Sequence, residues 1–249
     1  LKYFVGNWKM FGNLSSIKII YQISRFYKHF KTNNKPNKIV FCVPSTLINF
    51  FKTKLKTNLV NIGAQNCHFN ETSGPFTGSI NSSMLKDAGA KYIILGHSDN
   101  RSAGETDEII KKKVKSALSQ NLNVIFCIGE TLKEKKNKKT FLVLKKQIIK
   151  GIDKKFDLNK IIIAYEPIWS IGTGKIPKIN DLTKTFSFIK ITVKKFFKTN
   201  KEPPILYGGS VNSKNINMFA PLSNLDGFLI GGASQSAKNF IDILKNYYK

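Results

Sequence analysis

Four polar side chains stand where short apolar runs of the sequence end, which is where a buried strand would pass into a loop. Asn7 and Lys9 follow the first run, His97 follows the fourth, and Glu166 closes the sixth. Small residues follow the last two runs: Ser210, Gly231 and Gly232. One potential base, one imidazole and one fixed cation suit proton transfer beside the carbonyl of a phosphorylated substrate better than they suit hydrolysis.

The spacing of cysteines and histidines argues against a metal site and against a disulfide framework. The three cysteines are an odd number and form no Cys-X-X-Cys pair, and no two of the three histidines lie four residues apart. We therefore expect no metal site, and a reducing compartment for the chain.

Eight apolar runs bounded by turn-forming residues predict eight β-strands, at residues 3–7, 39–43, 60–65, 92–96, 124–129, 161–166, 205–208 and 227–231. The runs are continuous rather than alternating, which is typical of parallel strands buried on both faces. Amphipathic stretches at helical spacing separate them. Three of these helices are expected to begin at capping pairs: Ser15-Ser16, Ser45-Thr46 and Asn180-Asp181.

Strand and helix thus alternate eight times at about 30 residues per unit, which predicts an α/β fold with a parallel sheet. This number of units fits a closed (β/α)₈ barrel, eight parallel strands ringed by helices, as a single domain over residues 1–249. An open doubly wound sheet is the alternative. It usually carries a G-x-G-x-x-G loop after its first strand, where this chain has Gly6-Asn7-Trp8-Lys9.

Six segments resemble signature segments of the triosephosphate isomerase family, in family order and spacing. They read Gly6-Asn7-Trp8-Lys9-Met10, Gly96-His97-Ser98, Ala164-Tyr165-Glu166-Pro167-Ile168-Trp169, Ile171-Gly172-Thr173-Gly174-Lys175, Tyr207-Gly208-Gly209-Ser210-Val211 and Gly231-Gly232-Ala233-Ser234. The resemblance implies a TIM barrel and a cofactor-free isomerase. Its reaction would interconvert dihydroxyacetone phosphate and D-glyceraldehyde 3-phosphate by proton transfer through an enediolate, as in glycolysis and gluconeogenesis.

The resemblance also assigns roles to individual residues. Glu166 would shuttle the proton, a neutral His97 would polarise the carbonyl, and Lys9 would supply the fixed cation, with Asn7 beside it. The substrate phosphate would be held by backbone N–H groups of Gly172, Ser210, Gly231 and Gly232. Residues 167–175 would form a lid, with Glu130 in a supporting role.

Each residue also has a plainer interpretation when taken alone. Glu166 could be a helix N-cap, His97 a core histidine, and the glycines parts of tight turns. We assign His68 to the core and His29 to a surface helix.

Asp99 and Asn100 depart from the family, which usually has Glu and Arg at these positions. Asp99 is one methylene shorter, so its reach to Lys9 is expected to differ, and this bears on turnover rate rather than on identity. Phe11 stands where Asn is usual, and nothing in the sequence explains it.

The segment 74–79 matches the loop that members of the family insert into a partner subunit. On this resemblance Thr77 would reach the partner's active site and support Lys9 and Asn7. Ser79 and Asn100 replace a Glu and an Arg that pair across that interface. Because both partners of the ion pair are lost together, we expect a homodimer with a neutral contact here; a weakened dimer is the alternative.

The formal net charge of +26 suggests an anionic partner. However, 39 of the 41 basic residues are lysine, scattered along the chain, and aromatic residues do not alternate with them as in a stacking platform. We therefore expect small anionic triose phosphates as partners and no specific nucleic acid. No apolar run is long enough to span a membrane, and no signal-peptide pattern opens the chain, so a cytoplasmic location is expected.

Three other functions compete with the isomerase interpretation. The first is a barrel that binds triose phosphates but turns them over slowly because of Asp99. The second is a related phosphosugar isomerase, since a fold does not fix a function. The third is a basic scaffold that retains nucleic acid in a salt-sensitive manner.

Overall fold

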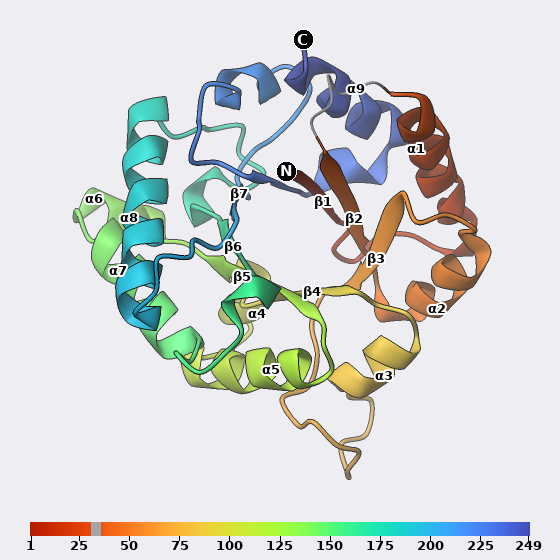
Figure 1. Ribbon diagram of the computed structural model, residues 1–249, viewed down its shortest axis with the longest axis horizontal. Helices are drawn as coiled ribbons and strands as arrows, with labels where there is room; N and C mark the ends of the chain where they lie inside the picture. The colour runs from red at the N-terminus through yellow and green to blue at the C-terminus, as the bar shows by residue number, and fades with distance from the viewer. Residues whose placement is uncertain (31–35) are drawn as a thin grey trace.

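The computed structural model describes residues 1–30 and 36–249 and shows eight parallel strands closed into a barrel (Figure 1). The strands are β1 (Lys2–Asn7), β2 (Asn37–Cys42), β3 (Val60–Ala64), β4 (Tyr92–Leu95), β5 (Asn123–Ile128), β6 (Ile161–Tyr165), β7 (Ile205–Tyr207) and β8 (Gly227–Ile230). Each strand pairs with its neighbours in sequence, and β1 closes the ring on β8 with Phe4 opposite Phe228. The predicted (β/α)₈ barrel is thus confirmed.

All eight predicted strands are present, but seven of them end earlier than expected. The residues predicted to close these strands begin the following loops instead: Val43, Gln65, Gly96, Gly129, Glu166, Gly208 and Gly231. Gly96 shows one physical reason, because its φ of 72° lies in the left-handed region and breaks the extended backbone. The shift places Glu166 on the first loop residue after β6.

Nine α-helices surround the barrel within the described residues (Figure 1). They are α1 (Ile17–His29), α2 (Ser45–Lys54), α3 (Ser82–Asp87), α4 (Ser98–Ser102), α5 (Asp107–Ser119), α6 (Leu132–Lys136), α7 (Thr140–Gly151), α8 (Ile179–Phe197) and α9 (Ala237–Tyr247). The helix expected between β7 and β8 is only a short 3₁₀ turn, Ile216–Phe219.

The predicted capping pairs lie within one residue of the three helix starts, but none of them makes a side-chain capping bond to α1, α2 or α8. Ser45-Thr46 and Asn180-Asp181 lie inside the first turns of α2 and α8, which begin after Pro44 and Lys178 without a side-chain cap. Ser16 precedes α1, but its side chain makes no capping bond to that helix. Polar residues are also tolerated within the first turn, so the sequence pattern left the helix starts uncertain by one or two residues.

The core has two layers because successive side chains of a strand point to opposite faces. Inside the barrel, alternate strand residues pack on one another, among them Val5, Val40, Ile94 and Leu229. The intervening residues, such as Phe4, face outward and pack under the helices. Burial on both faces explains why the strands read as continuous apolar runs.

Candidate active site

The three predicted catalytic side chains meet at the carboxyl ends of β1, β4 and β6. His97 Nε2 lies 3.4 Å from Glu166 Oε1, and Lys9 Nζ lies 3.0 Å from Asp99 Oδ2. The same Asp99 oxygen is 3.6 Å from His97 Nδ1, too far for a hydrogen bond, so the carboxylate pairs with the lysine alone. Asp99 therefore reaches Lys9 despite its shorter side chain.

Lys9 is held in an uncommon backbone conformation by its neighbour. Its φ is 54°, in the left-handed region that favours glycine. The Asn7 side chain accepts a hydrogen bond from the Lys9 backbone N–H at 3.0 Å, and Gln65 lies 3.5 Å from the same Asn7 oxygen. Non-glycine residues in this region persist only where their surroundings fix them, and they cluster at functional sites. Asn7 thus directs the lysine toward the mouth of the barrel.

The hydrogen bonds of His97 identify its tautomer. His97 is buried at the start of α4, and its Nδ1 accepts the backbone N–H of Asp99 at 3.1 Å. An acceptor nitrogen carries no proton, so a neutral ring has its proton on Nε2, the nitrogen that faces Glu166. The ring can therefore donate a hydrogen bond to a substrate oxygen at this point.

Glu166 is a buried carboxylate with one oxygen left for chemistry. Its residue is 3% exposed, and Oε2 has no hydrogen-bond partner among the described residues. Gly208 makes room for it, since a Cβ there would lie 2.5 Å from Glu166 Cγ. Below it, burial raises the pKa of the Cys127 thiol well above its ordinary value, and the nearby Glu166 carboxylate raises it further. The thiol therefore stays neutral.

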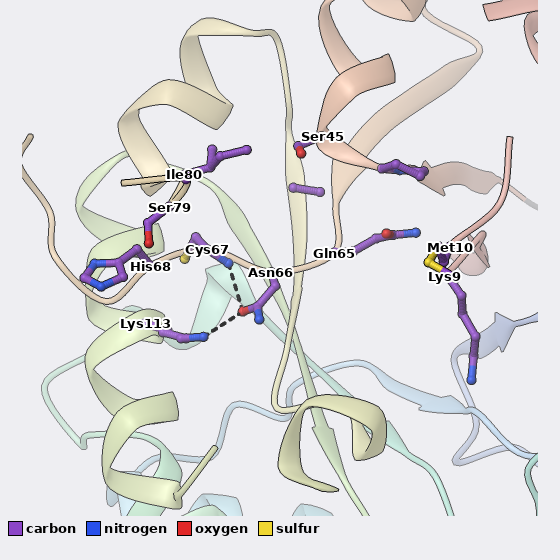
Figure 2. A pocket seen from close by; sticks show the side chains of 13 residues that line it. Lys9, Met10, Ser45, Gln65, Asn66, Cys67, His68, Ser79, Ile80 and Lys113 are labelled. Carbon is purple, nitrogen blue, oxygen red and sulfur yellow. Dashed lines mark hydrogen bonds between the residues drawn. The ribbon is translucent and has the colours of Figure 1, made fainter. Parts of the chain in front are cut away.

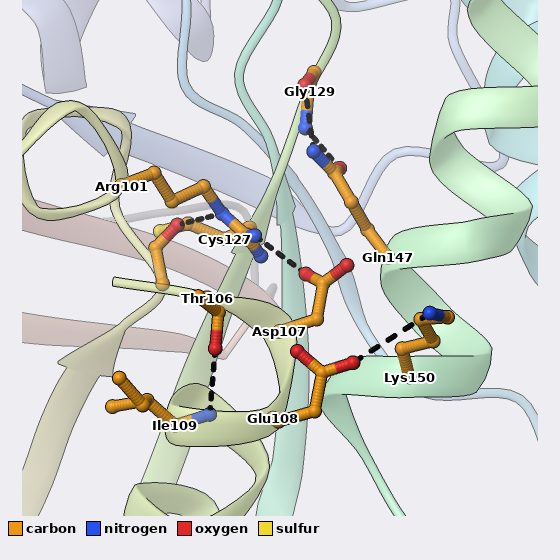
Figure 3. Close-up of polar contacts among 10 residues, drawn as sticks. Arg101, Thr106, Asp107, Glu108, Ile109, Cys127, Gly129, Gln147 and Lys150 are labelled. Carbon is orange, nitrogen blue, oxygen red and sulfur yellow. Dashed lines mark hydrogen bonds and ion pairs between the residues drawn. The ribbon is translucent and has the colours of Figure 1, made fainter. Parts of the chain in front are cut away.

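Arg101 fastens the loop that carries His97 to the neighbouring strand (Figure 3). Its guanidinium donates to the carbonyl of Gly96 at 2.7 Å and to that of Cys127 at 3.2 Å, and it pairs with Asp107 at 2.6 Å. One planar fork therefore links the ends of β4 and β5 to the first turn of α5.

The Glu130 carboxylate holds the first turn of the lid in place. Its carboxylate accepts the indole N–H of Trp169 at 2.8 Å and the hydroxyl of Tyr165 at 3.1 Å. The preceding Gly129 is pinned by Gln147, which bonds both its N–H and its carbonyl, at 2.9 and 3.1 Å (Figure 3). These contacts join the Glu130 carboxylate to the end of β6 and to the first turn of the lid.

The predicted phosphate-binding residues lie in three separate loops. Ser210 follows β7, and Gly231 and Gly232 follow β8 at the start of the 3₁₀ turn Gly232–Gln235. Gly172 lies at the exposed tip of the lid. The Trp8 indole donates to the Ser234 carbonyl at 3.1 Å, which ties the loop after β8 to the loop of Lys9.

A pocket of about 510 Å³ opens beside Lys9. Figure 2 shows Lys9 and Met10 at one end of it and His68 and Ser79 at the other. His68 is half-buried in the pocket wall, where its ring stacks on Phe69, so its expected place in the core is wrong. His29, by contrast, is exposed on α1 as predicted.

The loop 74–79, which contains Thr77, is exposed throughout and extends outward beyond the ring of helices (Figure 1). Thr77 therefore lies away from the Lys9 and Asn7 of its own chain.

Four positioning residues of the site were not identified from sequence: Arg101, Cys127, Gln147 and Ser170. Each of them makes at least one contact with a residue 18 or more positions away, and only the fold reveals these contacts. Arg101 alone carried a usable signal, because it is one of two arginines in the chain and follows Gly96-His97-Ser98 closely.

Two further properties concern the described residues only. No three His, Cys, Asp or Glu side chains gather there in a way that could hold a metal ion. Within the same ranges, none of the helices has the length and apolar character needed to cross a membrane.

Comparison with known proteins agrees with this geometry. The family model described as triosephosphate isomerase matches residues 2–247. The triosephosphate isomerases of Zygosaccharomyces bailii and Endomicrobium trichonymphae are 40% and 39% identical to the chain; the alignments cover 97% and 96% of this chain and 96% of each relative. The crystal structure of triosephosphate isomerase from Bartonella henselae superposes with a TM-score of 0.88 at 34% identity, covering 100% of this chain and 99% of that one. With its fold and nearly its whole length matched, the chain belongs to the triosephosphate isomerase family.

Proposed function

We propose that Glu166, His97 and Lys9 perform the isomerisation at the mouth of the barrel. As a member of its family, the chain is an isomerase that interconverts dihydroxyacetone phosphate and D-glyceraldehyde 3-phosphate. The observation that carries the residue assignment is a series of contacts: the buried Glu166 carboxylate lies beside the His97 imidazole, and Asp99 contacts both that imidazole and the Lys9 side chain.

The proton moves between two adjacent carbons of the substrate. Glu166 takes a proton from the carbon beside the carbonyl, and the electron pair forms the carbon–carbon double bond of an enediolate. His97 donates from Nε2 to the oxygens, where negative charge develops, and the Lys9 ammonium stabilises the same charge. A proton passes through His97 Nε2 from the hydroxyl oxygen of the first carbon to the former carbonyl oxygen. Glu166 then returns its proton to the neighbouring carbon as the new carbonyl forms, so base and imidazole are both restored.

The substrate phosphate binds to backbone N–H groups of Ser210, Gly231, Gly232 and, once the lid closes, Gly172. Glycines allow the backbone to approach the phosphate closely, and the start of the 3₁₀ turn after β8 directs N–H groups outward. A closed lid excludes water, which protects the enediolate from losing its phosphate by elimination. Asp99 supports the site by orienting Lys9.

The competing proposal is a barrel that binds triose phosphates but turns them over slowly. Its basis is the shorter side chain of Asp99, whose reach to Lys9 is expected to differ from that of the usual Glu. The contact of 3.0 Å between Asp99 and Lys9 removes the geometric reason for it. The full isomerase assignment is therefore the better supported of the two.

We also propose a homodimer in which loop 74–79 of one chain enters the pocket beside Lys9 of the other. The loop extends beyond the helices and exposes Phe76, while Met10 at the pocket is fully exposed. Exposed apolar side chains of this kind mark interaction surfaces. In such a dimer, Thr77 would reach the partner's site and support Lys9 and Asn7, with Ser79 and Asn100 forming a neutral contact.

Two further proposals concern the whole chain. Cys42, Cys67 and Cys127 are all free and buried thiols, which suits the reducing cytoplasm. Residues 1–249 are proposed to form one domain, since pairing of β1 with β8 joins the two ends of the chain in one sheet.

Replacing His97 tests the assignment directly. His97→Gln replaces the fixed imidazole Nε2–H with the amide of a flexible side chain, and we expect kcat to fall about 100- to 1,000-fold, as for other disrupted oxyanion donors. His29→Gln, an exposed histidine on α1, is the matched control and should retain wild-type kcat. An equal effect of both variants, or none from His97→Gln, would refute the role of His97.

A further inference from the structure

We propose that the Ser170 hydroxyl is a lock that holds the lid in the position seen here and is released when phosphate binds. The inference rests on the proposed function, because it assumes that the Ser210 N–H binds the substrate phosphate. Ser170 ends the 3₁₀ turn Ile168–Ser170 that begins the lid, and its side chain is fully buried.

Three groups surround the Ser170 hydroxyl, and together they use its full hydrogen-bonding capacity. The carbonyl of Lys175, at the far end of the lid, lies 2.5 Å from Oγ and is a pure acceptor, so the hydroxyl proton points to it. Oγ then accepts from the Tyr207 hydroxyl at 2.9 Å and from the Ser210 N–H at 3.4 Å. A single oxygen thus ties both ends of the lid to the end of β7.

Gly209 leaves room for the contact between Ser170 and Tyr207. A Cβ at Gly209 would lie 2.1 Å from the Tyr207 hydroxyl oxygen and 2.6 Å from Ser170 Oγ, so any larger residue would separate the pair. The Tyr207 side chain is fully buried, and a buried hydroxyl needs a partner. Burial raises the pKa of Tyr207 to about 12, against the opposing effect of the Ser170 hydrogen bond, so the phenol keeps the proton that it donates.

The lid between the two tied ends is braced internally. The Thr173 hydroxyl donates to the Trp169 carbonyl at 3.1 Å and accepts the Lys175 N–H at 3.2 Å. Its tip, residues 172–175, is exposed. A segment braced in this way moves as a unit about its ends, and the Ser170 contacts hold those ends.

The substrate phosphate and the Ser170 hydroxyl compete for one hydrogen-bond donor, the backbone N–H of Ser210. When a phosphate takes the Ser210 N–H, Ser170 loses one of its three partners. The contact at 3.4 Å is the longest of the three and therefore the easiest to exchange. Substrate arrival would thereby loosen the lid, and product departure would restore the lock.

The test is the affinity of Ser170→Ala for 2-phosphoglycolate, which carries a phosphate and a carboxylate in place of the enediolate. Without the lock we expect binding about fivefold tighter and a KM lower by a similar factor, since one net hydrogen bond no longer favours the unliganded lid. The value of kcat should not rise, because the lid reopens more slowly. Stopped-flow fluorescence of Trp169 in the lid reports this reopening.

Two further variants separate the lock from a general loss of structure. Tyr207→Phe keeps the ring and removes the donor, so it should tighten binding in the same direction, and the double variant should bind no tighter than the stronger single one. Ser116→Ala, at a buried serine of α5 that bonds Ser82 at 2.7 Å, is the matched control and should bind 2-phosphoglycolate as the wild type does.

The outcomes are distinct. Unchanged or weaker binding in Ser170→Ala would overturn the lock, and so would additive effects of Ser170→Ala and Tyr207→Phe. A wild-type chain that neither isomerises triose phosphates nor binds 2-phosphoglycolate would instead overturn the proposed function.

Discussion

At the scale of single residues, Asp99 is where this chain departs from its family within the site. Its carboxylate already reaches Lys9 at 3.0 Å, and both side chains are partly exposed, so solvent screens their attraction. We expect Asp99→Glu, which restores the usual family residue, to change kcat/KM by less than about threefold. A rise of tenfold or more in the steady-state assay would show that the shorter side chain limits turnover.

Glu130 gives a prediction for the dependence of stability on pH. Burial raises its pKa above the ordinary value of 4.5, although hydrogen bonds from Trp169 and Tyr165 oppose the rise. At a pH between the pKa of Glu130 in the unfolded chain and its higher pKa in the folded chain, the folded state binds more protons than the unfolded state. The free energy of unfolding therefore falls as the pH rises through this interval. Glu130→Gln cannot ionise and should gain stability relative to the wild type over the same interval. Urea unfolding of both proteins at several pH values measures this difference. A wild type more stable than Glu130→Gln in this pH interval would contradict the prediction.

At the scale of secondary-structure elements, Arg101 joins β4, β5 and α5 through a nearly buried fork. Arg101→Lys keeps the charge but loses the planar set of donors to Gly96, Cys127 and Asp107. We expect the free energy of unfolding to fall by about 2–4 kcal/mol, because buried acceptors are left unpaired. The matched control is Lys150→Met, which breaks an exposed ion pair with Glu108 and should leave the urea midpoint unchanged. Equal effects of the two variants would contradict this account.

The order of the elements was predictable from sequence, whereas their ends were not. Each strand is buried on both faces, so its apolar run is continuous and easily found, and Asn7, Lys9, His97 and Glu166 follow such runs. The ends depend on local backbone events, such as the positive φ of Gly96, that an apolar pattern does not record. Contacts such as Arg101 with Cys127, or Ser170 with Tyr207, join a residue that follows one strand to a residue on the next strand. They depend on how the barrel aligns those strands, and the sequence pattern does not specify this alignment.

At the scale of the whole molecule, the net charge of +26 opposes self-association. We expect a dimer nonetheless, tighter at about 500 mM salt than at about 50 mM, because salt screens the repulsion between the two chains. Phe76→Asp in the protruding loop should shift the population toward monomer. Sedimentation that shows a stable monomer at both salt concentrations would refute the dimer.

The central claim is that Glu166 is the base of the isomerisation, and a coupled assay of glyceraldehyde 3-phosphate isomerisation with Glu166→Asp beside the wild type tests it most directly. The shorter side chain withdraws the carboxylate from the substrate carbon without removing its charge. We expect a fast wild type and a variant slower by about 100-fold or more, since a positioned base tolerates little displacement. A variant that matches the wild type, or a wild type without activity, would contradict the claim.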